Sequence, residues 1–494
     1  MSEAAEKIDL AELLAKRRTV WEKLEFEKIK QRNIKTSGDK WKSKYKEPAD
    51  IISNLLSELP QGWIWASVAQ IGFVISGQTP KGIADVKERE GIPWFKVGDM
   101  NTEGNEHNIK KAETYLTPDQ ISDLKLNVQP EGTIIFPKRG GAILTNKKRI
   151  LAQPSAYDLN TMGVYPVGVE KKYLWYWFLS LNLGSLSDGS NVPQINHGDI
   201  EPLPVPVAPS DQQKRIVAKI EELFSHIDAG IEALKKAKQL LKQYRQSALK
   251  AAVTGELTKE WREESEGVDI DGLPGLIAKH LGNDFTKYQE VEDKKGWIKV
   301  VLKDISSRVS VGHVGKTSEF YCDESEGVPF LRSQNVRPGR VVFEGTRYIA
   351  KEFHDSLKKS QLQEGDLLIV RVGANRGDAA VMPKFEGDIN CANIVFARTP
   401  KGLGGYLDVY FQSKLWTDLV DSITTGSAQG VINTKTVEKV KLEIPPLVEM
   451  KKILELVEEK SSGISRLEDE IDSQLIKADI SKQSVLASAF SGQI

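Results

Sequence analysis

The chain has 494 residues, of which 40% are apolar and 28% are charged. This composition is typical of folded globular domains, and it excludes a wholly disordered or collagen-like chain. The length favours roughly three domains. No apolar run approaches the ~20 residues that a membrane-spanning helix needs, and the first residues lack the apolar stretch of a signal peptide. By elimination, we expect a cytoplasmic protein.

The charges nearly cancel, with 68 basic and 69 acidic residues. The chain is therefore not globally basic, but a local basic patch can still bind nucleic acid. Two cysteines, Cys322 and Cys391, cannot form a disulfide framework, so we expect free, buried thiols in a reducing compartment. None of the six histidines is paired with cysteine at zinc-finger spacing, and we expect no metal site.

The chain contains two copies of one unit, because short motifs recur in the same order at offsets of 233 to 237 residues. The residues between these motifs differ from one copy to the other. The matching motifs are Gly62-Trp63 with Gly296-Trp297, Gly132-Thr133-Ile134-Ile135 with Gly365-Asp366-Leu367-Leu368, Tyr173-Leu174 with Tyr406-Leu407, Ile195-Asn196 with Ile432-Asn433, and Gly255 with Gly492.

Residues 1–57 lie outside this repeat. Alanine, leucine, lysine and glutamate dominate up to Lys30 and predict a helix, whereas Lys35–Lys46 is basic and polar and predicts a loop. In each copy a strand-rich part of about 150 residues then follows. Short, β-branched runs bounded by glycine, such as Thr133–Phe136 and Leu367–Val370, predict its strands. Proline-rich segments at 202–209 and 445–446 end it.

A long helix closes each copy. In copy one, apolar residues step by three or four between about Asp211 and Val253, with Asp211 as a suitable N-cap and Gly255 as a suitable C-cap. Two such apolar seams favour mutual, antiparallel packing if the copies are related by a pseudo-twofold axis. The alternative is two separate amphipathic helices, each on its own domain. The seams are Ile220, Leu223, Ile227, Ile231, Leu234, Ala237, Leu241, Tyr244 and Ala248 in copy one, and Ile453, Val457, Ile464, Leu467, Ile471, Leu475, Val485 and Leu486 in copy two.

The sequence contains no recognisable catalytic motif. Gly315-Lys316-Thr317 resembles the end of a phosphate-binding loop, but Ser310 stands where that loop needs a glycine, so a basic turn after a strand is the better interpretation. The chain has no Gly-x-Ser-x-Gly elbow, no His-Glu-x-x-His helix and no tetrapeptide of amino-methylating enzymes. Nothing singles out a catalytic pair of carboxylates.

A basic, glycine-containing segment follows the same strand in both copies. Its residues in copy one are Lys138, Arg139, Asn146, Lys147, Lys148 and Arg149, and in copy two Arg371, Asn375 and Arg376. Arginine, lysine, asparagine and glutamine are the side chains that read base edges or bind phosphates. A lone cluster of this kind is usually a solvated hairpin tip, but its presence in both copies favours DNA contact.

A second polar group follows another pair of matching strands, and here DNA contact and ordinary turn residues are about equally favoured. It comprises Lys96, Asp99 and Asn101 in copy one and Arg332, Gln334, Asn335 and Arg337 in copy two. The aromatic run Tyr173–Phe178 can suggest a base-stacking platform, but its matching spacing in copy two favours core packing.

This layout resembles the DNA-specificity subunit of type I restriction-modification enzymes, over about residues 58–494. The second copy departs from the pattern with Val448-Glu449-Met450 in place of a Gln-Gln pair, and the extension at 1–57 is not part of the minimal pattern. The residues that carry the resemblance are Leu59-Pro60-Gln61-Gly62-Trp63, Gly132-Thr133-Ile134-Ile135-Phe136-Pro137-Lys138, Pro204-Val205-Pro206, Gln212-Gln213-Lys214-Arg215-Ile216 and Leu249-Lys250-Ala251-Ala252-Val253-Thr254-Gly255-Glu256-Leu257-Thr258.

The resemblance implies an α+β fold with two target-recognition domains and two long helices that form an antiparallel coiled coil. Each domain would read one half of an asymmetric, bipartite target in double-stranded DNA. The helices would set the gap between the half-sites and bind two methyltransferase subunits, which a restriction/translocase subunit joins. S-adenosylmethionine, ATP and Mg²⁺ would belong to these partners, and the chain itself would need no cofactor and would not be catalytic alone.

The expected division follows the repeat and the resemblance together. It is a helical extension at 1–57, a first target-recognition domain at 58–208, a central helix at 209–257, a linker at 258–294, a second domain at 295–446 and a distal helix at 447–494. Three alternatives stay open: a specificity subunit of a methyltransferase-only or other phage-defence complex, a non-catalytic coiled-coil scaffold, and a nuclease or other enzyme that acts alone.

Overall fold

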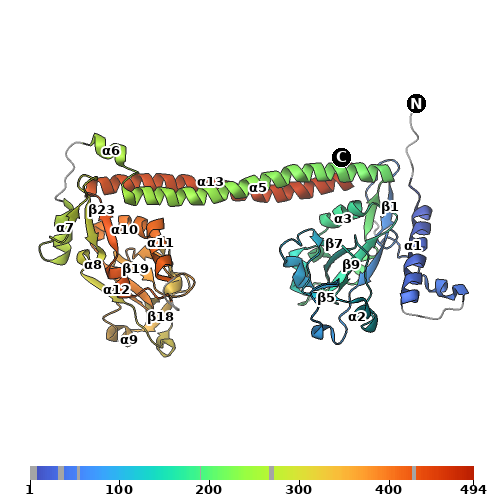
Figure 1. The fold of residues 1–494 in the computed structure, drawn as a ribbon, viewed down its shortest axis with the longest axis horizontal. Helices are drawn as coiled ribbons and strands as arrows, with labels where there is room; N and C mark the ends of the chain where they lie inside the picture. Colours follow the sequence, from blue (N-terminus) through green and yellow to red (C-terminus); the bar gives the residue numbers. More distant parts are fainter. Residues whose placement is uncertain (1–7, 32–37, 53–55, 190, 266–271, 425–429) are drawn as a thin grey trace. The chain divides into compact units, whose positions relative to one another are not determined.

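The computed structural model describes residues 8–31, 38–52, 56–189, 191–265, 272–424 and 430–494. The chain divides into a first unit, Met1–Glu232 with Leu475–Ile494, and a second unit, Ala233–Gln474. Two long helices, α5 (Ser210–Thr254) and α13 (Leu447–Phe490), contribute to both units (Figure 1). Each unit contains helices and sheets, as expected for an α+β chain.

The first described element of the first unit is a helix. The strands that follow it form three sheets. Its elements are α1 (Leu10–Gln31), β1 (Ile64–Ser67), β2 (Gly72–Ser76), β3 (Ile92–Phe95), β4 (Asn108–Ile109), β5 (Thr114–Leu116), α2 (Pro118–Asp123), β6 (Ile134–Pro137), β7 (Arg149–Leu151), β8 (Ala156–Tyr157), β9 (Thr161–Pro166), α3 (Lys171–Ser180), α4 (His197–Ile200) and β10 (Pro204–Val207).

The second unit follows the same plan with a few additional short elements. They are α6 (Lys259–Glu264), α7 (Gly272–Leu281), β11 (Gln289–Glu290), β12 (Ile298–Val301), α8 (Leu302–Ile305), β13 (Arg308–Val311), β14 (Tyr321–Cys322), β15 (Gly327–Leu331), β16 (Val336–Arg337), β17 (Arg340–Val341), β18 (Arg347–Ala350), α9 (Lys351–Ser356), β19 (Asp366–Val370), β20 (Ala379–Val381), β21 (Asn390–Cys391), β22 (Ile394–Arg398), α10 (Gly404–Gln412), α11 (Lys414–Thr424), α12 (Thr434–Glu438) and β23 (Lys441–Ile444).

Two sheets of the first unit share a strand order with two sheets of the second unit. The order β2-β9-β6-β7 in the first unit matches β13-β22-β19-β20 in the second, and β5-β3-β8 matches β18-β15-β21. Individual backbone hydrogen bonds also recur at equivalent positions of the two units. The backbone N–H of Gly77 donates to Thr161 O at 3.0 Å, and that of Gly312 donates to Ile394 O at 2.8 Å. The repeat found in the sequence is therefore a repeat of backbone structure.

A helix lies between the main sheet and the long helices in each unit, α3 in the first and α10 in the second (Figure 1). The aromatic run forms α3, and Tyr173, Trp177 and Phe178 are buried in it. The Tyr173 hydroxyl donates to Pro206 O at 2.6 Å, and its ring meets the ring of Phe490 edge-on. The prediction that this run packs in the core is confirmed.

The two long helices are present, as predicted, and their segments run antiparallel within each unit. In the first unit Asp228 of α5 pairs with Lys482 of α13 at 2.5 Å. In the second unit Arg245 pairs with Glu468 at 2.7 Å. Helix α5 begins at Ser210, so Asp211 lies in its first turn rather than at the N-cap, and Gly255 ends it with a φ of +80°.

Two seam predictions are wrong. Tyr244 and Leu467 are 49% and 54% exposed, so these two positions do not belong to the buried seam. One cysteine prediction also fails, since Cys391 is buried but Cys322 is partly exposed.

The segment expected as a charged linker, 258–294, is folded where the structure describes it. It contains α6 and α7, and Leu273 and Ile277 belong to the hydrophobic core of the second unit. The expected loop at 35–46 is also partly structured, with a 3₁₀ helix over Gly38–Lys44 whose Trp41 is buried. Both segments are rich in charged residues, so the sequence pattern did not indicate the few apolar side chains that tertiary contacts bury.

The N-terminal helix belongs to the repeat, contrary to expectation. Leu13 of α1 lies so close to Gly168 that a Cβ there would meet its Cδ2 at 2.9 Å. Leu276 of α7 lies against Gly402 in the same way, at 3.0 Å. The two glycines are 234 residues apart, and both helices carry the pattern Leu-x-x-Leu-[Leu/Ile]-Ala-Lys. In each unit an equivalent helix thus precedes the strand-rich part, and the two helices are 263 residues apart, more than the 233 to 237 residues between the other matching motifs.

Candidate nucleic-acid interface

In each unit the candidate residues directly follow the ends of two strands. In the first unit Lys96 follows β3 and Lys138 follows β6. One turn joins the two strand ends, because the Asp158 N–H donates to Phe95 O and the Lys138 N–H donates to Asn160 O, both at 2.8 Å. The two predicted groups of polar residues therefore emerge next to the same turn.

The second unit repeats this arrangement with different side chains. Arg332 follows β15 and Arg371 follows β19. The Ala392 N–H donates to Leu331 O at 2.9 Å, which matches the bond to Phe95 in the first unit. The carbonyl of Arg371 accepts from Ile432 N–H at 3.1 Å, as that of Lys138 accepts from Ile195 N–H at 2.9 Å.

Several cations and amides of the first unit remain accessible at this edge. Lys96 and Arg139 are exposed, and Lys96 has a long ion pair with Glu113, 3.5 Å between Nζ and Oε2. Lys147 donates to the exposed Asn101 side chain. Lys138 is half-buried, and its Nζ donates to Ser76 Oγ at 3.0 Å.

Three other residues predicted to contact DNA, Asn146, Lys148 and Arg149, make hydrogen bonds within the first unit. Lys148 is 2% exposed, and its Nζ donates to Leu181 O at 2.6 Å and to Asn146 Oδ1 at 2.8 Å. Burial lowers the pKa of Lys148 to about 8. Arg149 donates to Met100 O at 2.8 Å, and burial lowers its pKa as well. The sequence shows the charge of these side chains but not their direction.

In the second unit the arginines are half-buried and partly unsatisfied. The Nε atoms of Arg332 and Arg371 are buried and lack a hydrogen-bond partner within the described part of the chain. Such unpaired donors are costly unless a ligand or water satisfies them, so they suit an anionic or hydrogen-bonding partner. Gln334 is exposed and Asn375 is half-buried.

Two further arginines of the second unit are held by main-chain carbonyl groups. Arg337 donates to Val336 O at 2.9 Å, and the NH1 group of Arg376 donates to Gly430 O at 2.9 Å. Both are half-buried. These contacts fix part of each guanidinium group at the loop.

Asn335, which the sequence predicted to contact DNA, lies in the interior of the second unit. It is fully buried, its Oδ1 accepts from the Arg332 N–H at 2.9 Å, and its Nδ2 donates to Val342 O at 2.9 Å. Asp99 does the same in the first unit, where it accepts from the Lys96 N–H at 2.7 Å. Burial raises the pKa of Asp99. Both residues close the turn after a strand.

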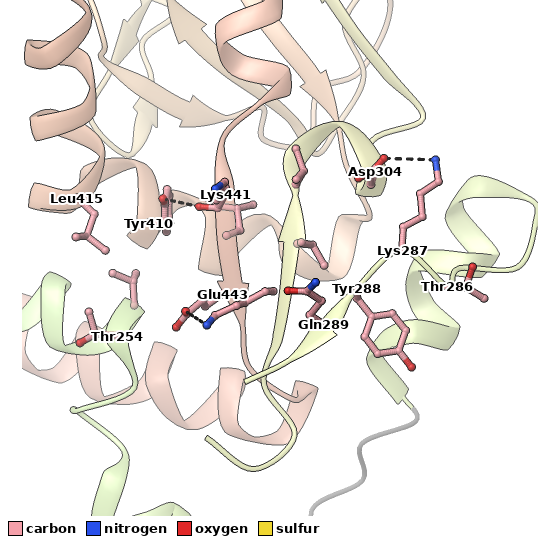
Figure 2. A pocket seen from close by; sticks show the side chains of 15 residues that line it. Thr254, Thr286, Lys287, Tyr288, Gln289, Asp304, Tyr410, Leu415, Lys441 and Glu443 are labelled. Atoms are coloured by element: carbon pink, nitrogen blue, oxygen red, sulfur yellow. Dashed lines mark hydrogen bonds and ion pairs between the residues drawn. The ribbon is translucent and has the colours of Figure 1, made fainter. Parts of the chain in front are cut away.

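The second unit also contains a cavity of about 720 Å³ beside β12 and β23 (Figure 2). None of the residues predicted to contact DNA lines it. Its carboxylates already have partners: Asp304 lies 3.6 Å from Lys287, and Glu443 lies 3.5 Å from Lys299. The cavity is therefore separate from the strand ends described above. Among the described residues, no group of three or more His, Cys, Asp or Glu side chains could hold a metal ion.

Comparisons with known proteins agree with this architecture. The family model of the type I restriction modification DNA specificity domain matches residues 60–242. The chain is 23% identical to the type I restriction enzyme EcoKI specificity subunit of Escherichia coli strain K12, over 88% of this chain and 90% of the relative. Residues 60–242 therefore carry this DNA-specificity domain, and the chain as a whole is similar to specificity subunits of type I restriction enzymes.

The similarity extends to more distant members. The chain is 22% identical to the type I restriction enzyme MjaVIII specificity subunit of Methanocaldococcus jannaschii, over 80% of this chain and 85% of the relative. Its fold resembles a chain solved in work on complex assembly and conformational transition of the type I R-M system. That match has a TM-score of 0.61 at 16% identity and covers 89% of this chain and 100% of that chain. In the described residues, no helix of the chain is both long and apolar enough to cross a membrane.

Proposed function

We propose that this chain is a specificity subunit that recognises an asymmetric, bipartite sequence in double-stranded DNA, with one half-site read by each unit. One observation carries the proposal: the same two strand ends in each unit present different side chains. Lys138 in the first unit corresponds to Arg371 in the second, and Lys96 corresponds to Arg332. A common scaffold with different base-reading groups favours two different half-sites.

In this proposal the subunit supplies recognition, and its partners supply catalysis. Methyltransferase subunits would bring S-adenosylmethionine, and a restriction/translocase subunit would bring ATP and Mg²⁺. The chain itself would bind no cofactor. Support comes from the matching specificity domain and from the sequence, which offers cationic and amide groups at the strand ends but no motif of a known catalytic centre.

The long helices offer surfaces for the methyltransferase subunits. Ile476 and Ile480 of α13 are each 62% exposed and lie one helical turn apart in the first unit. In the second unit Leu240 and Leu467 are each 54% exposed. Exposed apolar side chains on paired helices suit further helices from a partner, which would bury them.

The same helices would set the distance between the half-sites. Helix α5 has 45 residues, which corresponds to about 68 Å, or two turns of DNA at roughly 34 Å each. Inserting four residues after Lys236 would lengthen α5 by about 6 Å, so the tolerated gap should change by one or two base pairs. An unchanged gap would remove the ruler function while leaving recognition intact.

Methylation mapping of the host genome, with and without this gene, tests the central proposal. A split, asymmetric methylated motif should be present in the parent and absent from the deletion strain. Co-purification should yield methyltransferase subunits, and the presence of a restriction/translocase subunit separates a complete system from a methyltransferase-only or other phage-defence complex. A contiguous or palindromic motif would contradict two different half-sites.

The salt dependence of DNA binding separates recognition from a scaffold role. If lysine and arginine neutralise phosphates, the logarithm of the affinity should fall linearly with the logarithm of the salt concentration. A coiled-coil scaffold predicts no DNA affinity at all. An enzyme that acts alone would cleave or methylate DNA in a purified preparation without partners.

A further inference from the structure

Four side chains form a continuous hydrogen-bonded chain at the candidate interface of the first unit. Lys138, after β6, donates through Nζ to Ser76 Oγ at the end of β2, at 3.0 Å. Ser76 Oγ lies 3.0 Å from His197 Nε2 in α4. His197 Nδ1 lies 3.0 Å from Glu201 Oε1. Neither composition nor spacing in the sequence brings these four residues together.

The second unit has the same backbone structure at the equivalent positions, but its side chains there are different. Ser76 pairs with Met162 across β2 and β9, and the matching position in β13 is Val311, which pairs with Val395. Helix α12 begins after Asn433 as α4 begins after Asn196, so Thr434 takes the place of His197. Because the second unit holds the same fold with valine and threonine, the fold does not require the hydrogen-bonded chain.

The donors and acceptors allow two protonation states of His197, and only one of them orients the Ser76 hydroxyl proton. A lysine ammonium only donates, so Ser76 Oγ accepts from Lys138 and has its own proton and a second lone pair left. His197 Nε2 can accept that proton when it carries none itself, or it can donate its own proton to the second lone pair of Ser76 Oγ. In the first arrangement the imidazole proton is on Nδ1, 3.0 Å from Glu201 Oε1. A neutral His197 therefore orients the Ser76 hydroxyl, and the oriented hydroxyl holds the ammonium of Lys138.

We propose that His197 is a positioning residue for DNA reading, acting through Ser76 to aim the ammonium group of Lys138 at a base edge. The inference rests on the proposed function and deepens it for the first half-site alone. Base discrimination at that half-site then depends on a neutral His197, whereas discrimination at the second half-site does not.

The charged groups around His197 indicate how its protonation would change base discrimination at the first half-site. Glu201 lies at the end of its own helix and Lys138 comes from β6, while β2 contributes no charged residue. Asp199 of α4 is engaged with the N–H of Asn196 at 2.7 Å. The His197 side chain is 43% exposed. Protonation would remove the acceptor of Ser76 and place a second cation beside Lys138, which would loosen the ammonium group.

The test is a binding selection from randomised DNA duplexes with the intact chain and its partners, at about pH 8 and about pH 5.5, which bracket histidine titration. In the wild-type protein, base preference at one half-site should fall by on the order of tenfold at the lower pH, as expected for a cation pair separated by two hydrogen bonds. The other half-site should keep its preference and serves as the internal reference.

Two variants carry the residues found at the matching positions of the second unit. His197→Thr and Ser76→Val should fold normally, retain the second half-site, and show the weak first preference at both pH values. His226→Thr, on an exposed face of α5, is the matched control and should behave as wild type.

The outcomes separate the two proposals. If the selection returns no split motif, the proposed function fails. If it returns a split motif whose halves respond equally to pH, or if His197→Thr leaves the first preference unchanged at about pH 8, the positioning role of His197 is overturned.

Discussion

The indole N–H of Trp297 donates a 2.9 Å hydrogen bond to Glu449 in the first turn of α13. Trp63 makes the matching bond to Gln212 in α5, also at 2.9 Å. The second helix therefore begins in the same way as the first, although it lacks the glutamine pair. Glu449 is fully buried and also accepts from Arg262 at 2.9 Å, which replaces a neutral amide contact with a buried ion pair.

Removing this carboxylate should destabilise the second unit. Glu449→Ala leaves the guanidinium of Arg262 and the indole of Trp297 unpaired, so we expect a loss of about 3–5 kcal/mol in unfolding free energy. Glu449→Gln keeps an acceptor for Trp297 and should cost less. Urea unfolding measures both, with exposed Glu459→Ala as the control. Equal effects of Glu449→Ala and Glu459→Ala would contradict the buried ion pair.

The equivalence of α1 and α7 predicts that the N-terminal helix stabilises the first unit. Leu13 is 2% exposed and packs in the core, so Leu13→Ala should lower the unfolding free energy of that unit by about 2–4 kcal/mol. Lys16→Ala, on the exposed side of the same helix, should change it little. A first unit that is equally stable with Leu13→Ala would show that α1 only lies on the surface.

Charge removal should weaken one half-site at a time. Arg371→Ala should lower affinity for duplexes with an intact second half-site by about 1–3 kcal/mol, while preference at the first half-site stays unchanged. If Arg371 binds a phosphate instead, the loss should be the same for all sequences, and the salt slope should fall by about one. Titrations with duplexes mutated in one half-site distinguish these cases. Arg215→Ala, exposed on α5, is the control.

Charges placed on the exposed apolar positions of α13 should prevent partner binding without unfolding the chain. Ile480→Glu should abolish or strongly reduce co-purification of a methyltransferase subunit, because a desolvated carboxylate in an apolar contact is unfavourable. Ser484→Glu places the same charge on a nearby exposed position and should bind normally. The thermal transition of both variants should match that of the wild type. Full retention of the partner by Ile480→Glu would place the docking surface elsewhere.

Stability of the second unit should depend on the protonation of one carboxyl group. Burial raises the pKa of Asp408 to about 7, although its Oδ1 accepts from the Val381 N–H at 2.9 Å. The folded chain keeps this proton while the unfolded chain, with an ordinary pKa of about 3.9, releases it. Stability is therefore lost as the pH rises from about 4 to about 7.

Asp408→Asn removes this penalty. The variant should be more stable than the wild type by about 1–3 kcal/mol at pH 8, and the difference should vanish towards pH 4. Calorimetry at both pH values measures it. A difference that is independent of pH would mean that Asp408 is already ionised in the folded chain.

Much of the fold was predictable from local signals. The helix predicted over Asp211–Val253 spans Ser210–Thr254, because its apolar residues recur at helical spacing and glycine ends it. The strands around Thr133–Phe136 and Leu367–Val370 were equally clear. The folded segments within 258–294 were not, since Leu273 and Ile277 are few among charged residues and gain their stability only from the core they enter.

The candidate site was predictable only as a set of segments. The sequence placed Lys96, Lys138, Arg332 and Arg371 after matching strands, and the structure brings each pair to one turn. It gave no indication that Lys148 and Asn335 are buried, because charge and polarity do not reveal the direction of a side chain. Ser76, His197 and Glu201 were missed, as they meet only through contacts between distant strands and α4.

The sequence by itself determined the repeat, the long helices and the family resemblance, since these depend on order and periodicity along one chain. Tertiary structure alone decided which polar groups are free to bind, which brace a loop, and which helix accompanies each unit. The physical reason is that burial and hydrogen-bond partners are properties of residues far apart in the sequence. Gly168 meets Leu13 and Trp297 meets Glu449 only when the backbone has folded.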